Sequence, residues 1–235
     1  MERYDPRTAL IVVDVQNDFA DPAGSLCVGT GEEVAASWSE EVGLASAAGA
    51  FVVYTQDWHP PSTPHFAKDG GIWPVHCVAG TWGASFHPAL DVAGPVVRKG
   101  VNGEDGYSGF TMRDPVTGET MPTELDPMLR AQGIERVVVC GLATDYCVNA
   151  TAVDARQLGF PTEVLEDAIA AVNLQAGDDA RAISAMADAG CTFAERMSAA
   201  AARTAATRAA NQTPASAANA TPASPAGSSR DRAGE

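Results

Sequence analysis

The segment Val137–Ala155, VVVCGLATDYCVNATAVDA, constrains the fold of this chain more than any other stretch. Its β-branched valines predict a strand that ends at Gly141, and a helical pattern with Thr144 as its N-cap follows. The apolar face of that helix is formed by Val148, Ala152 and Ala155. A strand, a tight turn and a helix in succession are the building unit of a parallel α/β sheet.

Cys147 lies in the first turn of this predicted helix, just beyond the carboxyl end of the strand. Unpaired backbone N–H groups and the positive end of the helix dipole favour an anion there, so we expect a thiol that ionises readily. A cysteine taken at random is more often an inert core residue. Ligands of open α/β sheets, however, bind at the carboxyl ends of the strands, and this position favours a reactive Cys147.

Short apolar runs alternate with helical patterns along the rest of the chain. Further strands are predicted at 8–15, 50–57, 95–100, 161–168 and 191–194, and further helices at 31–49, 123–133 and 177–190. Strands that alternate with helices form βαβ units with helices on both faces. The sequence therefore predicts a three-layer α/β/α domain over residues 1–195, with a central, mostly parallel sheet of about six strands.

Residues 196–235 differ in composition from the rest of the chain. They are rich in Ala, Ser, Thr and Pro and contain no Val, Ile, Leu or aromatic residue. Such a segment cannot bury enough apolar surface to offset its chain entropy, so we expect a disordered tail. An Ala-rich helix through Ala205 is the local alternative. We expect a chain that ends at Glu195 to fold.

The charge and the cysteines exclude several classes of protein. Thirty acidic residues against 15 basic ones give a net charge of −15, which argues against nucleic acid or an anionic membrane as partner. No apolar run approaches the roughly 18 residues of a membrane span, and the first residues, MERYDPR, lack a signal-peptide core, so we expect a cytoplasmic protein. Five scattered cysteines without a CxxC pair disfavour a disulfide framework. The oligomeric state stays open, with a homo-oligomer as one alternative.

Charged side chains stand at the carboxyl ends of predicted strands. Asp14 ends the first strand, where a carboxylate is poor core material, so it is a candidate site residue. Lys99 ends the third strand; taken alone, it is equally compatible with a solvated surface lysine. Asp18 and Asp21 suit cap or turn positions. We expect Asp14, Lys99 and Cys147 to share one edge of the sheet.

A second group of polar residues follows the strand at 50–57. It contains three of the four histidines of the chain and one carboxylate: Asp57, His59, His65 and His76. Histidines in loops are more often hydrogen-bonded surface residues, but three of them beside a carboxylate favour one divalent metal ion. These ligands suit Zn²⁺, Mn²⁺ or Fe²⁺ and leave coordination positions for water or substrate.

Six motifs stand at the predicted strand ends and in the loops after them: DVQNDF at Asp14, DWHPPSTPHF at Asp57, WPVHCV at Trp73, RKG around Lys99, YSGF at Tyr107 and GLATDYCV at Gly141. In these motifs the chain resembles the isochorismatase-like cysteine hydrolases over roughly residues 8–195. Within that family it is similar to the nicotinamidase, or pyrazinamidase, branch. The histidine cluster is the discriminating feature, because the isochorismatase and carbamoylsarcosine-hydrolase branches lack it.

The resemblance implies a role for each matched position. It implies a catalytic triad of Asp14, Lys99 and Cys147, and a metal ion bound by Asp57, His59, His65 and His76. It further implies an oxyanion hole from the backbone N–H groups of Ala143 and Cys147, a cis peptide between Leu142 and Ala143, and a substrate pocket lined by Phe19, Trp73, Tyr107 and Tyr146. Two features depart from the family pattern: the loop between Lys99 and Tyr107 is slightly long, and Tyr146 stands where some relatives carry His.

The reaction that the resemblance implies is the deamidation of nicotinamide to nicotinate and ammonia in NAD salvage, with pyrazinamide as a further substrate. Asp14 would take the proton of Cys147, the thiolate would attack the carboxamide carbon, and water would cleave the thioester. Two alternatives remain open at this point. One is a metal-free relative acting on another small amide or a vinyl ether, and the other is a catalytically silent binding protein of the same fold.

Overall fold

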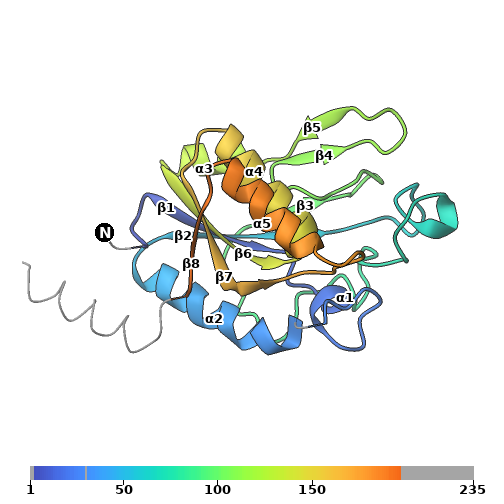
Figure 1. Cartoon of the computed structure of the whole chain (residues 1–235), viewed down its shortest axis with the longest axis horizontal. Coiled ribbons are helices and arrows are strands. Elements are labelled where there is room, and N and C mark those ends of the chain that lie inside the picture. The colour runs from blue at the N-terminus through green and yellow to red at the C-terminus, as the bar shows by residue number, and fades with distance from the viewer. Residues whose placement is uncertain (1–2, 30, 197–235) are drawn as a thin grey trace, which may run out of the picture. The chain divides into compact units, whose positions relative to one another are not determined.

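The computed structural model describes residues 3–29 and 31–196, and the predicted tail lies almost wholly outside this range. One six-stranded parallel sheet runs through the described residues in the order β3-β2-β1-β6-β7-β8 (Figure 1). Its strands are β1 (Thr8–Val13), β2 (Phe51–Asp57), β3 (Val96–Lys99), β6 (Arg136–Leu142), β7 (Thr162–Ala170) and β8 (Thr192–Ala194). The predicted fold class is confirmed.

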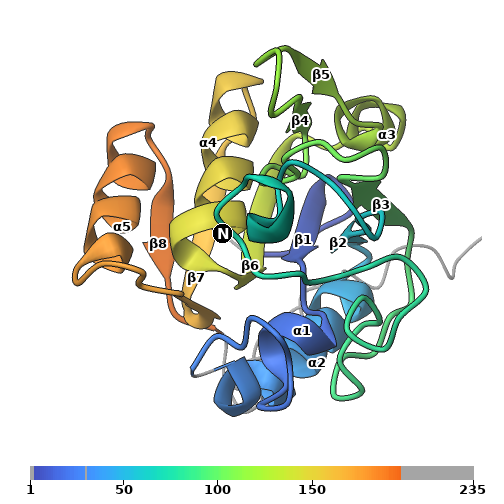
Figure 2. The ribbon, with the colours of Figure 1, turned by 90° about the vertical axis from the view of Figure 1, so that its right-hand side faces the viewer.

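Helices cover both faces of this sheet. They are α1 (Asn17–Ala20), α2 (Gly31–Ala47), the 3₁₀ turn η1 (Ala67–Asp69), α3 (Leu125–Ala131), the π-helix η2 (Thr144–Val148), α4 (Asn149–Gln157) and α5 (Asp178–Asp188). Figure 2 shows α1 and α2 on one side of the sheet and α3 and α4 on the other. No helix among the described residues is long and apolar enough to cross a membrane.

The six residues of β1, TALIVV, are all buried, because successive side chains of a strand point to opposite faces and both faces are covered. Leu10 belongs to the core that contains Trp38 of α2. Ile11, its neighbour, belongs to the second core, which contains Leu129 of α3 and Ala152 of α4. The continuous apolar run thus reflects two separate cores, one on each side of the sheet.

Several local features differ from the sequence prediction, including the short helices α1 and η1, which were not predicted. A small antiparallel hairpin of β4 (Thr111–Arg113) and β5 (Thr120–Pro122) lies outside the main sheet and was not predicted. Thr144 was expected to be an N-cap, but it is already the first residue of η2, and no side chain caps that helix. The N–H of Val148 bonds the carbonyl of Ala143, five residues back, which makes the turn a π-turn.

The ends of the strands meet closely at the carboxyl edge of the sheet. Gly141 pairs with Val13 at the end of the β1–β6 ladder, and a Cβ at Gly141 would lie 2.1 Å from the carbonyl oxygen of Val13, so only glycine fits there. On the other side of β1, Asp57 and Lys99 pair in register between β2 and β3. Residues from four strands are thereby brought to one place.

Candidate active site

Lys99 lies at the centre of a buried cluster of charges at this edge. Its Nζ is 2.6 Å from Oδ2 of Asp14, 2.6 Å from Oδ1 of Asp57 and 3.6 Å from Sγ of Cys147, and it also donates a hydrogen bond to the Gly106 carbonyl. Lys99 and Asp14 have no exposed surface. Burial of an ammonium is unfavourable unless its charge is paired, and the two carboxylates supply that pairing. The three predicted triad residues therefore come together.

Asp14 occupies a backbone conformation with φ of +48° that turns the chain out of β1. Its Oδ1 accepts a hydrogen bond of 2.7 Å from the hydroxyl of Thr55. Burial raises the pKa of Asp14 to about 6, because the attraction of Lys99 offsets the loss of solvation only in part and the Asp57 charge adds to it. A carboxyl group with this pKa can both accept and return a proton near neutral pH.

Burial also determines the protonation of Cys147. Loss of solvation raises the pKa of the thiol well above its ordinary value, Lys99 opposes this shift, and the charges of Asp14 and Asp57 add to it. The expectation of a readily ionised thiol is therefore wrong, because burial and the two nearby carboxylates raise the pKa of this thiol. The pKa of Lys99 is raised well above its usual range, since the two carboxylates outweigh the effect of burial. Lys99 stays an ammonium ion and Cys147 a thiol.

Asp57 connects this cluster to the histidines. One carboxylate oxygen, Oδ1, pairs with Lys99, while Oδ2 lies 3.7 Å from Nε2 of His59 and 3.9 Å from Nε2 of His76. Burial alone would raise the pKa of Asp57, but Lys99 and the histidines outweigh it, and the pKa lies below its ordinary value. Asp57 is thus an ionised carboxylate shared by two groups of residues.

The three predicted histidines converge, with ring nitrogens within 4.8 Å of one another. Nδ1 of His65 lies 2.7 Å from Oδ1 of Asp105, and Nδ1 of His76 lies 2.8 Å from the carbonyl of Pro74. These acceptors fix the proton on Nδ1 and leave Nε2 as a lone-pair donor. Burial lowers the pKa of His76 to about 4, so its ring is neutral at neutral pH.

His59 gives the clearest sign that this cluster fits a divalent metal ion. The ring is fully buried, and neither of its nitrogens has a hydrogen-bond partner among the described residues. A buried polar atom without a partner is costly and rare. Imidazole nitrogens beside a carboxylate are the donor set that Zn²⁺, Mn²⁺ and Fe²⁺ prefer. Asp57, His59, His65 and His76 therefore have the chemistry of metal ligands.

Asp105, which orients His65, was not identified in the sequence. It lies in the Gly-rich loop before β4, and its backbone N–H and carbonyl bond Arg113 of β4 at 2.7 and 3.0 Å. In an acidic protein, a single aspartate in a loop does not by itself indicate a functional residue. Only the position of its carboxylate beside a histidine ring gives it a role.

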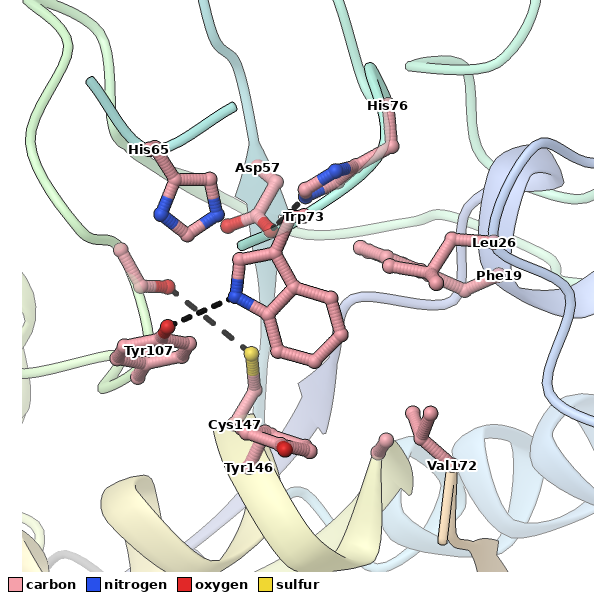
Figure 3. Close-up of a pocket in the computed structure, with 12 residues that line it drawn as sticks. Phe19, Leu26, Asp57, His65, Trp73, His76, Tyr107, Tyr146, Cys147 and Val172 are labelled. Atoms are coloured by element: carbon pink, nitrogen blue, oxygen red, sulfur yellow. Dashed lines mark hydrogen bonds and ion pairs between the residues drawn. The ribbon is translucent and has the colours of Figure 1, made fainter. Parts of the chain in front are cut away.

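A pocket opens beside the sulfur of Cys147 (Figure 3). Trp73 donates a hydrogen bond of 2.8 Å to the hydroxyl of Tyr107, and its ring packs edge-on against Tyr146 at 4.7 Å. Such walls suit a flat aromatic molecule. All four predicted pocket residues line it, and Leu26 and Val172, which were not predicted, do so as well: Phe19, Leu26, Asp57, His65, Trp73, His76, Gly106, Tyr107, Ala143, Tyr146, Cys147 and Val172.

The turn that carries Cys147 is held by hydrogen bonds to the end of a neighbouring strand. The peptide bond between Leu142 and Ala143 is cis, as the resemblance implies. The carboxylate of Asp145 accepts the backbone N–H groups of Val172 at 3.0 Å and Asn173 at 2.7 Å, which ties η2 to the end of β7. Ala143 and Cys147 thus border the pocket on a restrained backbone.

Asp18 was expected to be a cap or turn residue, and its contacts differ from that expectation. Its two oxygens accept the backbone N–H groups of Ser25 at 3.0 Å and Cys77 at 2.7 Å, so it joins two distant loops. Asp21 accepts the N–H of Ala23 at 2.8 Å and is a turn residue as expected.

Known proteins are similar to this chain in sequence and in architecture. Residues 8–201 match the isochorismatase domain. The chain is 37% identical over 206 residues to the nicotinamidase of Escherichia coli (strain K12), covering 80% of this chain and 94% of the relative, and 43% identical over 171 residues to the nicotinamidase/pyrazinamidase of Mycobacterium tuberculosis, covering 70% and 87%. A crystal structure of the pyrazinamidase of Pyrococcus horikoshii in complex with zinc has a TM-score of 0.72 at 38% identity, covering 81% of this chain and all of that one. The chain therefore belongs to the isochorismatase family.

Proposed function

We propose that this protein is a metal-dependent cysteine amidohydrolase that converts nicotinamide to nicotinate and ammonia in the cytoplasm. Pyrazinamide is a second substrate, and the physiological role is NAD salvage. One observation carries the proposal: Cys147, Asp57, His65 and His76 line the same aromatic-walled pocket (Figure 3). The similarity to nicotinamidases over most of the chain supports it.

Acylation begins with a proton transfer from the Cys147 thiol to Asp14. The sulfur attacks the carboxamide carbon, a C–S bond forms, and the carbonyl electrons move to the oxygen. The backbone N–H groups of Ala143 and Cys147 stabilise the charge on that oxygen. Asp14 then gives its proton to the nitrogen, the C–N bond breaks, and ammonia leaves. Lys99 remains an ammonium ion and holds the orientation of Asp14 through their 2.6 Å ion pair.

In deacylation, water takes the place of the thiol as the nucleophile that Asp14 deprotonates. Asp14, again a carboxylate, takes a proton from a water molecule whose oxygen attacks the thioester carbon. The C–S bond breaks, the sulfur recovers a proton from Asp14, and the acid that forms loses its own proton to solvent and leaves as nicotinate. A pKa of about 6 suits Asp14 to both proton transfers, because neither protonation state is strongly favoured near neutral pH.

The proposed ligands Asp57, His59, His65 and His76 would hold one zinc, iron or manganese ion. When bound, the ion supplies a Lewis acid with open positions for a ring nitrogen. Phe19 and Trp73 line the pocket and present apolar surface to the faces of a flat ring. Orientation of the substrate over the sulfur is the main benefit of this arrangement.

Incubation of the purified, metal-loaded protein with nicotinamide, followed by measurement of ammonia, tests the proposal. Nicotinamide and pyrazinamide both carry a ring nitrogen and should be hydrolysed. Benzamide has nearly the same shape but no ring nitrogen, and its rate of hydrolysis should be at most about one hundredth of that of nicotinamide. Equal rates for benzamide and nicotinamide would favour a metal-free mode of amide recognition. A folded, metal-loaded protein that releases no ammonia from nicotinamide would favour another substrate or a binding role.

A further inference from the structure

Gln16 is a fully buried residue between β1 and α1. Its side-chain Nε2 donates hydrogen bonds to the backbone carbonyls of Asp57 at 2.8 Å and Ala84 at 2.9 Å. Its Oε1 accepts the backbone N–H of Asp57 at 2.8 Å. Both amide hydrogens and the oxygen are therefore engaged, and Asp57 is bonded through its N–H and its carbonyl at once.

This contact takes the place of a missing strand neighbour. The β1–β2 ladder runs to the pair Val12 and Tyr54, after which the positive φ of Asp14 turns the chain away from the strand direction. Asp57 lies three residues further along β2, beyond the end of that ladder. A primary amide presents a donor and an acceptor side by side, so the Gln16 side chain bonds Asp57 as a strand backbone would.

The position of Asp57 matters because its two oxygens serve different partners. Oδ1 is 2.6 Å from Nζ of Lys99, and Oδ2 is 3.7 Å from Nε2 of His59. The carboxylate is joined to the backbone by only two rotatable bonds. A shift of the Asp57 backbone therefore moves both oxygens, and a side chain with only two torsions has little freedom to keep both contacts in a favourable geometry.

We propose that Gln16 is a positioning residue that fixes the Asp57 carboxylate between Lys99 and the histidine cluster and thereby sets the metal affinity. The inference rests on the proposed function insofar as Asp57 and the histidines hold the metal ion. Residues that orient metal ligands typically change metal affinity or activity roughly 10- to 100-fold when replaced.

Gln56 provides a matched control on the same strand. Its Nε2 donates to the same Ala84 carbonyl at 2.9 Å, and its Oε1 accepts a hydrogen bond of 3.1 Å from Nε of Arg98. Its side chain thus resembles that of Gln16 in chemistry, burial and one acceptor, but it bonds Ala84 and Arg98 instead of the Asp57 backbone. Methionine has a similar length and no amide, so it suits both positions.

The experiment compares Gln16→Met with Gln56→Met in the full chain. Folding is checked by circular dichroism, and the zinc dissociation constant is measured by competition with a chromophoric chelator. We expect Gln16→Met to weaken zinc binding roughly 10- to 100-fold and Gln56→Met to change it less than about threefold. At saturating zinc, Gln16→Met should still show a lower kcat with little change in KM, because Asp57 also holds Lys99.

Two results would overturn the inference: zinc binding at the wild-type level in folded Gln16→Met, or equal weakening in Gln56→Met. If Gln16→Met does not fold, Gln16→Asn replaces it. Asparagine keeps the amide on a side chain one methylene shorter, and its zinc affinity is compared with those of the wild type and Gln56→Met in the same way. Zinc binding does not depend on the substrate, so it tests Gln16 even if nicotinamide is not hydrolysed. Conversely, nicotinamide turnover with unchanged zinc affinity in Gln16→Met would contradict this inference alone.

Discussion

The triad and the histidine cluster lie side by side, yet they differ in how many of their polar atoms have an ion-pair or hydrogen-bond partner within the protein. The ammonium of Lys99 is paired with two carboxylates, and Asp14 receives a further hydrogen bond from Thr55. His59, in contrast, is buried with no hydrogen-bond partner for either ring nitrogen among the described residues. The difference supports the proposal that an ion completes the histidine cluster, whereas the triad residues pair with one another. Asp57 belongs to both.

Loss of the sulfur should have the largest effect and should leave the rest of the site in place. We expect Cys147→Ala to reduce nicotinamide turnover by roughly four orders of magnitude or more, because no other group forms the thioester. Its metal content should be unchanged. Cys140→Ala, in β6, is the control and should stay active. Equal loss of activity in both folded variants, measured by ammonia release, would contradict the assignment of the nucleophile.

Removal of the ion should have the next largest effect. It should impair the role of the histidine cluster and leave the Cys147 thiol reactive. Chelation, or His59→Ala, should lower nicotinamide turnover roughly 100-fold, and added zinc should restore the chelated wild type. Alkylation of Cys147 by iodoacetamide, followed by mass spectrometry, should still proceed in the metal-free protein. His87→Ala is the control, since His87 lies outside the cluster. Full activity in metal-stripped, folded protein would show that the ion is dispensable.

A smaller effect is expected from pH. Asp14 must be a carboxylate to accept the thiol proton, and its raised pKa of about 6 means that it becomes protonated at a higher pH than an ordinary aspartate. The value of kcat/KM should therefore fall about tenfold per pH unit below pH 6. Asp21→Asn should keep this profile. A rate that is constant down to pH 5 in folded protein would argue against Asp14 as the base.

Removal of residues 197–235 should have the smallest effect, because this segment has no Val, Ile, Leu or aromatic residue from which to build a core. The backbone N–H and the guanidinium of Arg196 contact Asp167 at 2.7 and 3.1 Å, so the cut is best placed after Arg196. We expect this shortened chain to keep its fold and its activity within about twofold. Precipitation or loss of most activity in the shortened chain would show that the segment contributes to the fold.

Regular elements were predictable from the sequence because burial imposes a pattern on them. The apolar runs that predicted β1, β2, β3, β6, β7 and β8 agree with the observed strands to within about two residues at each end. The strands β4 and β5 were missed because they have three residues each and no buried side chain, so they leave no apolar pattern.

Contacts between distant residues were harder to predict. The convergence of Asp14, Lys99 and Cys147 followed from the rule that parallel strands end at one edge. The pKa of Cys147, by comparison, depends on burial and on the summed charges around it, which no local pattern encodes. The π-turn at η2 was also missed, because Thr144 is a good cap residue and nothing in the local sequence distinguishes a five-residue turn from a four-residue one.

The backbone pairing of Asp105 with Arg113 connects the proposed metal site to a small peripheral hairpin. Asp105 reaches His65 through its side chain and β4 through its main chain, so one residue connects a proposed metal ligand to a hairpin that lies outside the main sheet. Insertions and deletions are tolerated most easily in such hairpins. A change in the length of this hairpin would therefore alter the orientation of a metal ligand without touching the sheet, the nucleophile or its base.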